Sequence, residues 1–237
     1  MHAHHAVQLC NPIGGNRAAA RPGPAAPWRA YVGALIPSNQ LHESDQAAPL
    51  IAACWFEPES SEARRLTPQQ PARHPIVSLG RGKLAAIVPQ LAEAWRECCP
   101  AARAAALIKE IVDILASRHS SRVETDPRIA RALEIQSLTP EKRISVADVA
   151  AAVSLSPSRF SHLFTRAVGV PPRRRLLWLR LRDAVRELAG GASITDSAHA
   201  AGFADAPHLN RTFRRMLGFT SHAAVSMFVQ DAQPRGW

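Results

Sequence analysis

Two stretches share one pattern, ITDSAHAAGFADAPHLNRTFRRMLG at residues 194–218 and VADVAAAVSLSPSRFSHLFTRAVG at residues 146–169. Their first halves align at an offset of 48 residues and their second halves at 49, because the later copy has one additional residue in its turn. Each copy has a short alanine-rich segment, a turn and a longer segment whose apolar residues recur at helical spacing. Ser156 and Asp205 precede the longer segments and are predicted to cap them. The pattern predicts two helix-turn-helix units.

The second helix of each unit carries side chains that can read DNA bases. Arginine can bind guanine through two hydrogen bonds, asparagine can bind adenine, and a small side chain can contact the thymine methyl group. We expect Asn210 and Arg211 to make the main base contacts, so that specificity depends mostly on the second unit. For each residue taken alone, an ordinary solvated helix position is the alternative. The candidate base-reading residues are Ser158, Arg159, Ser161, His162, Ala206, His208, Asn210 and Arg211.

A second group of arginines lies later on these helices or after the Pro171-Pro172 corner. Their positions favour contacts with phosphates, which supply affinity rather than sequence preference. We expect affinity to depend most on the run Arg173 to Arg175. The candidate phosphate contacts are Arg166, Arg173, Arg174, Arg175, Arg214 and Arg215.

An apolar stripe between the two copies predicts a long linker helix. Its members recur every three or four residues from Leu177 to Leu188, and Gly190-Gly191 follows as a stop. We expect this helix to join the units rigidly and to hold the two reading helices about one DNA turn apart.

The positive charge of the chain is concentrated in the same region. The 237 residues carry a formal charge of +10, and residues 157–217 contain eleven arginines against four acidic residues. A polyanion such as nucleic acid is the natural partner of such a surface. An arginine-rich solvated surface is one alternative, since only three of the 29 basic residues are lysine. A non-specific or architectural DNA-binding protein is another, although charge alone would not require the ordered repeat.

The N-terminal third alternates short apolar runs with turn residues. The runs at residues 4–9, 30–37 and 49–56 are separated by stretches rich in Pro, Gly, Asn and Ser, which predicts strands in a small β-sandwich or barrel. Apolar residues then recur at helical spacing over residues 84–95 and 104–115, which predicts two amphipathic helices.

Residues 127–225 resemble the AraC/XylS family of transcription regulators. The resemblance rests on SITDSAHAAGF at residues 193–203 and LNRTFRRMLG at residues 209–218, which look like the family's signature region. It implies seven helices, with two helix-turn-helix units joined by a linker helix. The sequence departs from the family after Gly218, because the following FTSH lacks the proline that the family often has there.

The resemblance also implies a cupin-type sensor domain that binds a small-molecule effector near the N-terminus. The expected fold class is α+β, with a small cupin-like β domain at residues 1–82, a helical dimerisation and linker region at 83–121 and an AraC-type DNA-binding domain at 122–237. We therefore predict a sequence-specific transcription regulator that binds double-stranded DNA. A homodimer and a contact with RNA polymerase are further expectations, and activation and repression are both compatible with this pattern.

Four histidines, His2, His4, His5 and His42, resemble the histidines of metal-binding cupins. A complete cupin metal motif would add a glutamate at a defined spacing and a second, glycine-bracketed histidine motif, and the sequence has neither. We therefore predict no metal and no cofactor. No run of eighteen apolar residues or signal-peptide pattern is present either, which predicts a cytoplasmic protein.

The cysteines indicate neither a disulfide framework nor catalysis. Cys10, Cys54, Cys98 and Cys99 form no C-x-x-C pair, although a soft metal or an oxidant could react at the adjacent pair. The enzymatic alternatives are a metal-dependent cupin enzyme and a DNA-repair alkyltransferase. The second needs an activated cysteine in a motif such as P-C-H, which none of the four has. We therefore predict no enzymatic activity.

Overall fold

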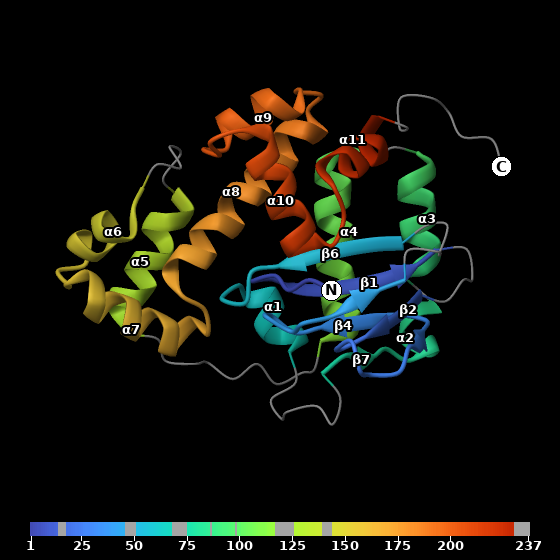
Figure 1. Ribbon diagram of the computed structural model, residues 1–237. Coiled ribbons are helices and arrows are strands. Elements are labelled where there is room, and N and C mark those ends of the chain that lie inside the picture. Colours follow the sequence, from blue (N-terminus) through green and yellow to red (C-terminus); the bar gives the residue numbers. More distant parts are fainter. Residues whose placement is uncertain are drawn as a thin grey trace. The chain divides into compact units, whose positions relative to one another are not determined.

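The computed structural model of the chain describes residues 1–13, 18–45, 51–67, 75–85, 87–97, 99–116, 126–138 and 144–229. These residues form two compact units that divide between residues 121 and 122. The first unit contains all the described strands and four helices, and the second is helical (Figure 1). The chain is therefore α+β, as the sequence predicts. None of the described helices is both long and apolar enough to pass through a membrane.

The first unit contains two antiparallel sheets. The larger sheet has the strand order β6-β1-β4-β7 and the smaller has the order β3-β2-β5. The strands are β1 (Val7–Pro12), β2 (Ala18–Arg21), β3 (Arg29–Tyr31), β4 (Ala34–Ile36), β5 (Glu43–Ser44), β6 (Ile51–Phe56) and β7 (Val77–Ser78). The predicted runs therefore correspond to β1, to β6 and, for residues 30–37, to both β3 and β4, while β2, β5 and β7 are additional.

The side chains of β1 alternate between two cores, as the period of two in a strand requires. Val7 and Leu9 lie in a core that also contains Ile111 and Val112 of a helix. Cys10 points to the opposite face and packs in a second core with residues from both sheets, Ala20 among them. Because both faces are covered, all six residues of β1 are buried.

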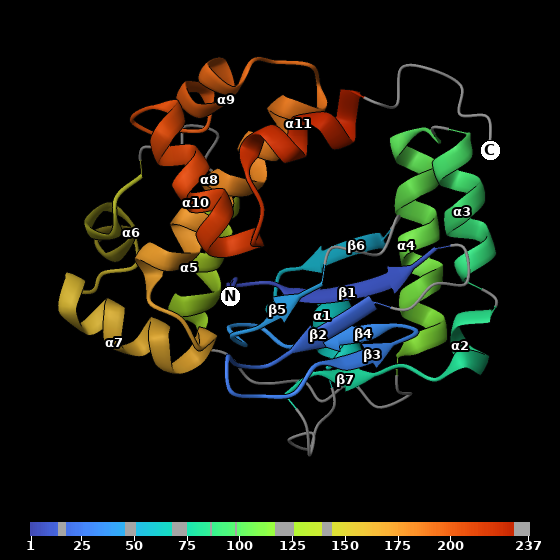
Figure 2. The ribbon, with the colours of Figure 1, turned by 45° about the vertical axis from the view of Figure 1, so that its right-hand side comes forward.

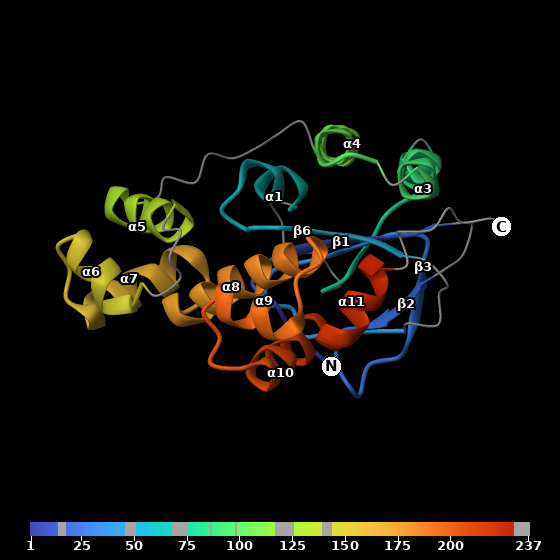
Figure 3. The same ribbon diagram turned by 90° about the horizontal axis from the view of Figure 1, so that it is seen from above.

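Four helices belong to the first unit: α1 (Ser61–Leu66), α2 (Arg81–Ala85), α3 (Val88–Arg96) and α4 (Ala101–Leu115). Figure 3 shows α1, α3 and α4 along one face of the larger sheet. The sequence predicts one helix where the structure has α2 and α3. Pro89 lies in the first turn of α3, where a proline is tolerated, whereas inside a continuous helix it would remove a hydrogen bond.

The described residues of the second unit form seven helices. They are α5 (Pro127–Leu138), α6 (Val146–Ala152), α7 (Pro157–Val168), α8 (Pro172–Ala189), α9 (Ile194–Ala200), α10 (Ala206–Leu217) and α11 (Ser221–Val229). Figure 2 shows α8 running from the group of α5, α6 and α7 to the group of α9, α10 and α11. This long helix is the linker that the apolar stripe predicts.

The apolar faces of the two helix-turn-helix units form their cores, as the sequence predicts. In the first helix-turn-helix unit, Phe160 and Phe164 are completely buried, with ring centroids 5.3 Å apart. In the second, Leu209 and Phe213 are completely buried at the corresponding positions. Truncating one of these phenylalanines to alanine would cost about 3–5 kcal/mol.

Candidate nucleic-acid interface

The two helix-turn-helix units have matching helix boundaries. The first helices, α6 and α9, begin 48 residues apart, and the second helices, α7 and α10, begin and end 49 residues apart. Ser145 and Ser193 cap α6 and α9, and each accepts a hydrogen bond from the backbone N–H three residues later. The single additional residue therefore lies in the turn of the second helix-turn-helix unit, between α9 and α10, as the alignment predicts.

The turns and caps of the second helices also correspond. Ser156 accepts from the N–H of Arg159 at 3.3 Å, and Asp205 accepts from the N–H of His208 at 2.6 Å. Both predicted N-caps are thereby confirmed. Gly169 and Gly218 end the two helices with φ of 81° and 83°, the left-handed conformation that favours glycine.

An exposed stripe runs along each second helix, opposite the buried face. On α7 it contains His162 and Arg166, and on α10 it contains Arg211 and Arg215 at the positions 49 residues later. Neither helix carries an acidic side chain. In the helix-turn-helix geometry this outer face is the one that enters the major groove.

The arginines of this surface are available for a ligand. Arg128, Arg131 and Arg186, elsewhere in the second unit, pair with aspartate or glutamate. By contrast, no ion pair occupies the guanidinium groups of the following residues within the described part of the chain: Arg159, Arg166, Arg173, Arg211, Arg214 and Arg215. We call these six residues the open arginines. No acidic side chain of the described segments neutralises their charge.

Asn210 lies differently from its expected place at the base-reading surface. Its Oδ1 atom accepts hydrogen bonds from the backbone N–H and the hydroxyl of Ser221, at 3.1 and 3.2 Å. Ser221 is the first residue of α11 and is 1% exposed. Asn210 therefore holds the start of α11, and its oxygen is not available for the paired hydrogen bonds that recognise adenine.

The other candidates on the reading helices vary in exposure. Ser158 and His162 are exposed, whereas Ser161 and Ala206 are partly buried. The His208 ring packs edge-on against the Phe203 ring at 5.2 Å between centroids. Pro207 is exposed and precedes Arg211 by one turn on the same stripe, where the register of the repeat predicts a position at the groove.

The run of three arginines at the start of α8 is not a single surface. Arg175 is 1% exposed, and its guanidinium donates to Oε1 of Gln136 at 2.7 Å and to the hydroxyl of Ser137 at 3.2 Å. Its position faces inward because it lies three residues after buried Pro172 on the same helix face. Arg173 is exposed and Arg174 is partly buried. Arg175 therefore joins α8 to α5, and we omit it from the proposed phosphate contacts.

The segment that departs from the AraC/XylS pattern still begins a helix. Thr220 accepts a hydrogen bond from the backbone N–H of Ala223 at 3.0 Å, so its hydroxyl caps α11 where a proline is absent. With the Asn210 contact, two side chains satisfy donors at this helix start.

The four histidines near the N-terminus separate into a cluster of three and one other. His2, His4 and His42 lie together, while His5 points away, and its Nε2 atom lies 3.1 Å from Oε2 of Glu59. Burial, and then repulsion from His42 and His4, lowers the pKa of His2 from 6.5 to about 3. Burial is also the main cause that lowers the pKa of His42 to about 4. The rings of His2 and His42 are therefore uncharged at neutral pH.

A family model for a helix-turn-helix domain matches residues 149–223. A protein of Streptomyces lividans, named as an AraC-like transcription regulator, is 33% identical over 94 residues, or 39% of this chain and 31% of its own length. Residues 149–223 are an AraC-type helix-turn-helix domain. The chain thus spans about a third of that relative.

The shared fold extends beyond the AraC-type domain. The crystal structure of ToxT from Vibrio cholerae covers 96% of this chain and 91% of its own, with a TM-score of 0.58 and 11% identity. At that identity the likeness concerns the fold. A transcriptional regulator of Chromobacterium violaceum with an AraC-type DNA-binding domain covers 46% of this chain and 96% of its own, at 29% identity and a TM-score of 0.41.

Proposed function

We propose that the AraC-type domain binds double-stranded DNA and that the protein regulates transcription from a specific operator. The observation that carries this proposal is the pair of equivalent helices, α7 and α10, with open arginines on their outer faces. A cation without an acidic neighbour keeps its full attraction for phosphate and for the acceptor edge of guanine. Non-specific binding would need the charge but not the duplicated caps and turns.

The exposed stripe divides into two roles. Arg211 near the middle of α10, with Arg159 and His162 on α7, is proposed to read bases, because the first turns of a recognition helix lie deepest in the groove. The open arginines near the helix ends, and Arg173 at the start of α8, are proposed to bind phosphates. Arg174 remains a candidate for the same role.

The central experiment compares an operator with random DNA. Full-length protein is titrated by fluorescence anisotropy against fragments tiled across its own upstream region and against shuffled fragments of equal length and composition. We expect one upstream fragment to be retained at a salt concentration that releases the shuffled ones, because phosphate contacts weaken with salt in both complexes. Equal release of every fragment would contradict sequence-specific regulation.

Two matched variants separate the roles of the arginines. Arg211→Ala should weaken operator binding by about 1–3 kcal/mol and relax the preference at one base pair. Arg131→Ala removes an equal charge from α5, where the arginine pairs with Glu134 at 2.6 Å, and should leave binding nearly unchanged. A uniform loss for Arg211→Ala across all fragments would make this residue a phosphate contact.

The two reading helices are proposed to address major-groove segments one turn apart. Inserting about five base pairs between the two protected segments of the operator places them on opposite faces of the duplex and should abolish binding by both helices. Inserting a full helical turn should return the two DNA segments to one face of the duplex but place them too far apart for α7 and α10 on a rigid α8 to reach both. Undiminished binding to both insertions would contradict the rigid linker.

The first compact unit, which contains the two sheets, is proposed to control the AraC-type domain. We propose that a small-molecule effector acts through this unit, and that α3 and α4 contribute to a homodimer. Sedimentation of the full chain tests the dimer, and a thermal-shift screen of small metabolites tests the effector. RNA polymerase is a proposed partner for an activating role, which transcription from the operator in a purified system would test.

A further inference from the structure

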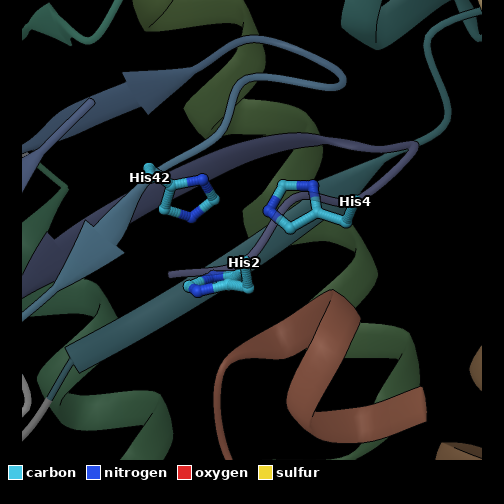
Figure 4. A group of neighbouring side chains, drawn as sticks. All are labelled: His2, His4 and His42. Carbon is cyan, nitrogen blue, oxygen red and sulfur yellow. The ribbon is translucent and has the colours of Figure 1, made fainter. Parts of the chain in front are cut away.

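We propose that His2, His4 and His42 form a binding site for a divalent transition-metal ion such as Zn²⁺, with the side-chain oxygen of Gln8 as a fourth ligand. Each histidine offers one ring nitrogen, and these nitrogens lie within 4.8 Å of one another. Figure 4 shows the three rings facing one another in the first unit. Imidazole nitrogens are common ligands of zinc, copper, iron and nickel. This site is separate from the DNA interface and does not depend on it.

The backbone around the cluster is held in register. His2 and His42 form a β-bridge in which each backbone N–H donates to the carbonyl of the other, at 2.8 and 2.9 Å. The N–H of Asn39 donates to the carbonyl of His4 at 2.8 Å. The segment before β1 is thereby joined to the segment before β5. The three rings, which are 7%, 1% and 0% exposed in chain order, start from fixed positions.

Hydrogen bonds determine which ring nitrogens carry protons. Nδ1 of His4 lies 2.8 Å from the carbonyl oxygen of Ala6, and Nδ1 of His42 lies 2.9 Å from that of Gln40. A carbonyl oxygen can only accept, so both Nδ1 atoms carry the hydrogen. In a neutral ring, Nε2 is then the unprotonated nitrogen. Backbone carbonyls that fix the tautomer in this way are the usual partners of metal-binding histidines.

The Nε2 atoms of His4 and His42 lie near the same side-chain oxygen. Nε2 of His4 and Nε2 of His42 lie 2.7 and 3.2 Å from the same atom, Oε1 of Gln8. With the amide in this orientation, two unprotonated nitrogens and an amide oxygen face one another, and a metal ion is a group that all three can bind. A metal ion satisfies all three acceptors at once. The Nε2 atom of Gln8 meanwhile donates to Sγ of Cys10 at 3.0 Å, which keeps the amide oxygen toward the histidines.

The arrangement suits a small, nitrogen-preferring ion. Zinc bonds to imidazole are about 2.0–2.1 Å long, so tetrahedral ligand atoms lie roughly 3.4 Å apart. When the ion binds, we expect the Gln8 oxygen to move back from Nε2 of His4, now 2.7 Å away, and the three ring nitrogens to approach one another from their present separations of up to 4.8 Å. Mg²⁺ and Ca²⁺ prefer oxygen ligands and should not compete.

The experiment measures metal binding by the full-length protein itself. The purification tag is placed at the C-terminus and removed, so that neither added histidines nor an extended N-terminus affects the cluster. After treatment with a chelator, the protein is titrated with Zn²⁺ against a chromophoric competitor and with Co²⁺ by visible absorption. We expect one ion per chain with a Kd below about 1 μM, tetrahedral Co²⁺ absorption bands and no response to Mg²⁺.

Three variants locate the site. His42→Gln should weaken Zn²⁺ binding by a factor of about 100 or more, since changing even an outer partner of a ligand costs 10–100-fold. His5→Gln is the matched control, because His5 adjoins His4 but bonds to Glu59, and it should bind normally. Gln8→Glu should strengthen binding about tenfold or more by supplying a negative ligand. Circular dichroism verifies that each variant is folded.

X-ray absorption at the zinc edge of the unaltered protein keeps the test independent of the variants, and three imidazole ligands are expected. The alternative is a hydrogen-bonded core in which the Gln8 amide is reversed and donates to both Nε2 atoms. Folded protein that binds neither Zn²⁺ nor Co²⁺ would establish this core and overturn the proposal. Tight binding that His42→Gln leaves intact would also overturn it, because the ion would then lie elsewhere.

Discussion

Replacing Asn210 with alanine should destabilise the AraC-type domain while leaving its DNA sequence preference unchanged. The Asn210 oxygen accepts from two donors of Ser221, and Ser221 is 1% exposed, so water cannot replace the lost acceptor. A buried donor without an acceptor costs about 1–3 kcal/mol. The hydroxyl can rotate toward another acceptor, but the backbone N–H cannot. We therefore expect a loss of about 2 kcal/mol, most of it from the N–H.

Hydrogen exchange measured by mass spectrometry is the appropriate assay, because the chain has two units and a single unfolding midpoint would mix them. Peptides from α10 and α11 should exchange about thirtyfold faster in Asn210→Ala, as a loss of about 2 kcal/mol requires. Asn210→Asp keeps an acceptor and should exchange normally. Ser161→Ala, at the corresponding position of the first helix-turn-helix unit, is the second control. Normal exchange combined with a changed base preference in Asn210→Ala would refute the capping role.

Three further predictions concern strain, burial and thiol reactivity. Ser154 has φ of 56°, a left-handed conformation that glycine adopts without strain, so Ser154→Gly should raise the free energy of unfolding by about 0.5 kcal/mol. A lower free energy of unfolding than that of the unaltered protein, measured by chemical denaturation, would contradict this. Arg175→Ala should lower the free energy of unfolding by about 2–4 kcal/mol, whereas Arg173→Ala should weaken DNA binding and leave stability unchanged. Equal melting temperatures of the two variants would refute the structural role of Arg175. Burial raises the pKa of Cys10 to about 12 and of Cys54 to about 11, so both thiols stay protonated near neutral pH. Mass spectrometry after brief iodoacetamide treatment of folded protein should find neither thiol alkylated, and rapid alkylation of buried Cys10 or partly buried Cys54 would contradict the raised pKa values.

The parts of the fold that the sequence predicts well depend on neighbouring residues. A cap needs one oxygen within three residues of the helix start, as at Ser156 and Asp205, and both hydrogen bonds are present. A left-handed helix end needs glycine, and the two repeats have it at Gly169 and Gly218. The cap residue and the terminal glycine occur in both copies of the repeat, so each prediction is supported twice. Boundaries of α7 and α10 follow from these local rules.

Side-chain roles that depend on distant partners could not be predicted in the same way. Asn210 and Arg211 are adjacent on α10 and both are able to contact bases. Their roles differ because α11 folds back so that Ser221 meets Asn210. Likewise, Arg175 differs from Arg173 because Gln136, 39 residues earlier, supplies a buried acceptor. Propensity gives the helix, but the packing of the next helix decides which polar side chains remain exposed.

In the histidine cluster, the spacing of His2 and His4 can be read from the sequence, but the approach of His42 cannot. His2, His4 and Gln8 stand at even-numbered positions and His5 does not, so the spacing is compatible with His5 lying apart from the group, although a bend at His5 and Ala6 interrupts the alternation of an extended chain. The approach of His42 depends on the bridge that it forms with His2 across 40 residues, which no local pattern specifies. A search for a glutamate after the histidines also misses Gln8, because an amide keeps the oxygen but not the charge. Geometry at this site is therefore more informative than the match to a metal-binding motif, because it brings together three ring nitrogens and an amide oxygen that no single motif contains.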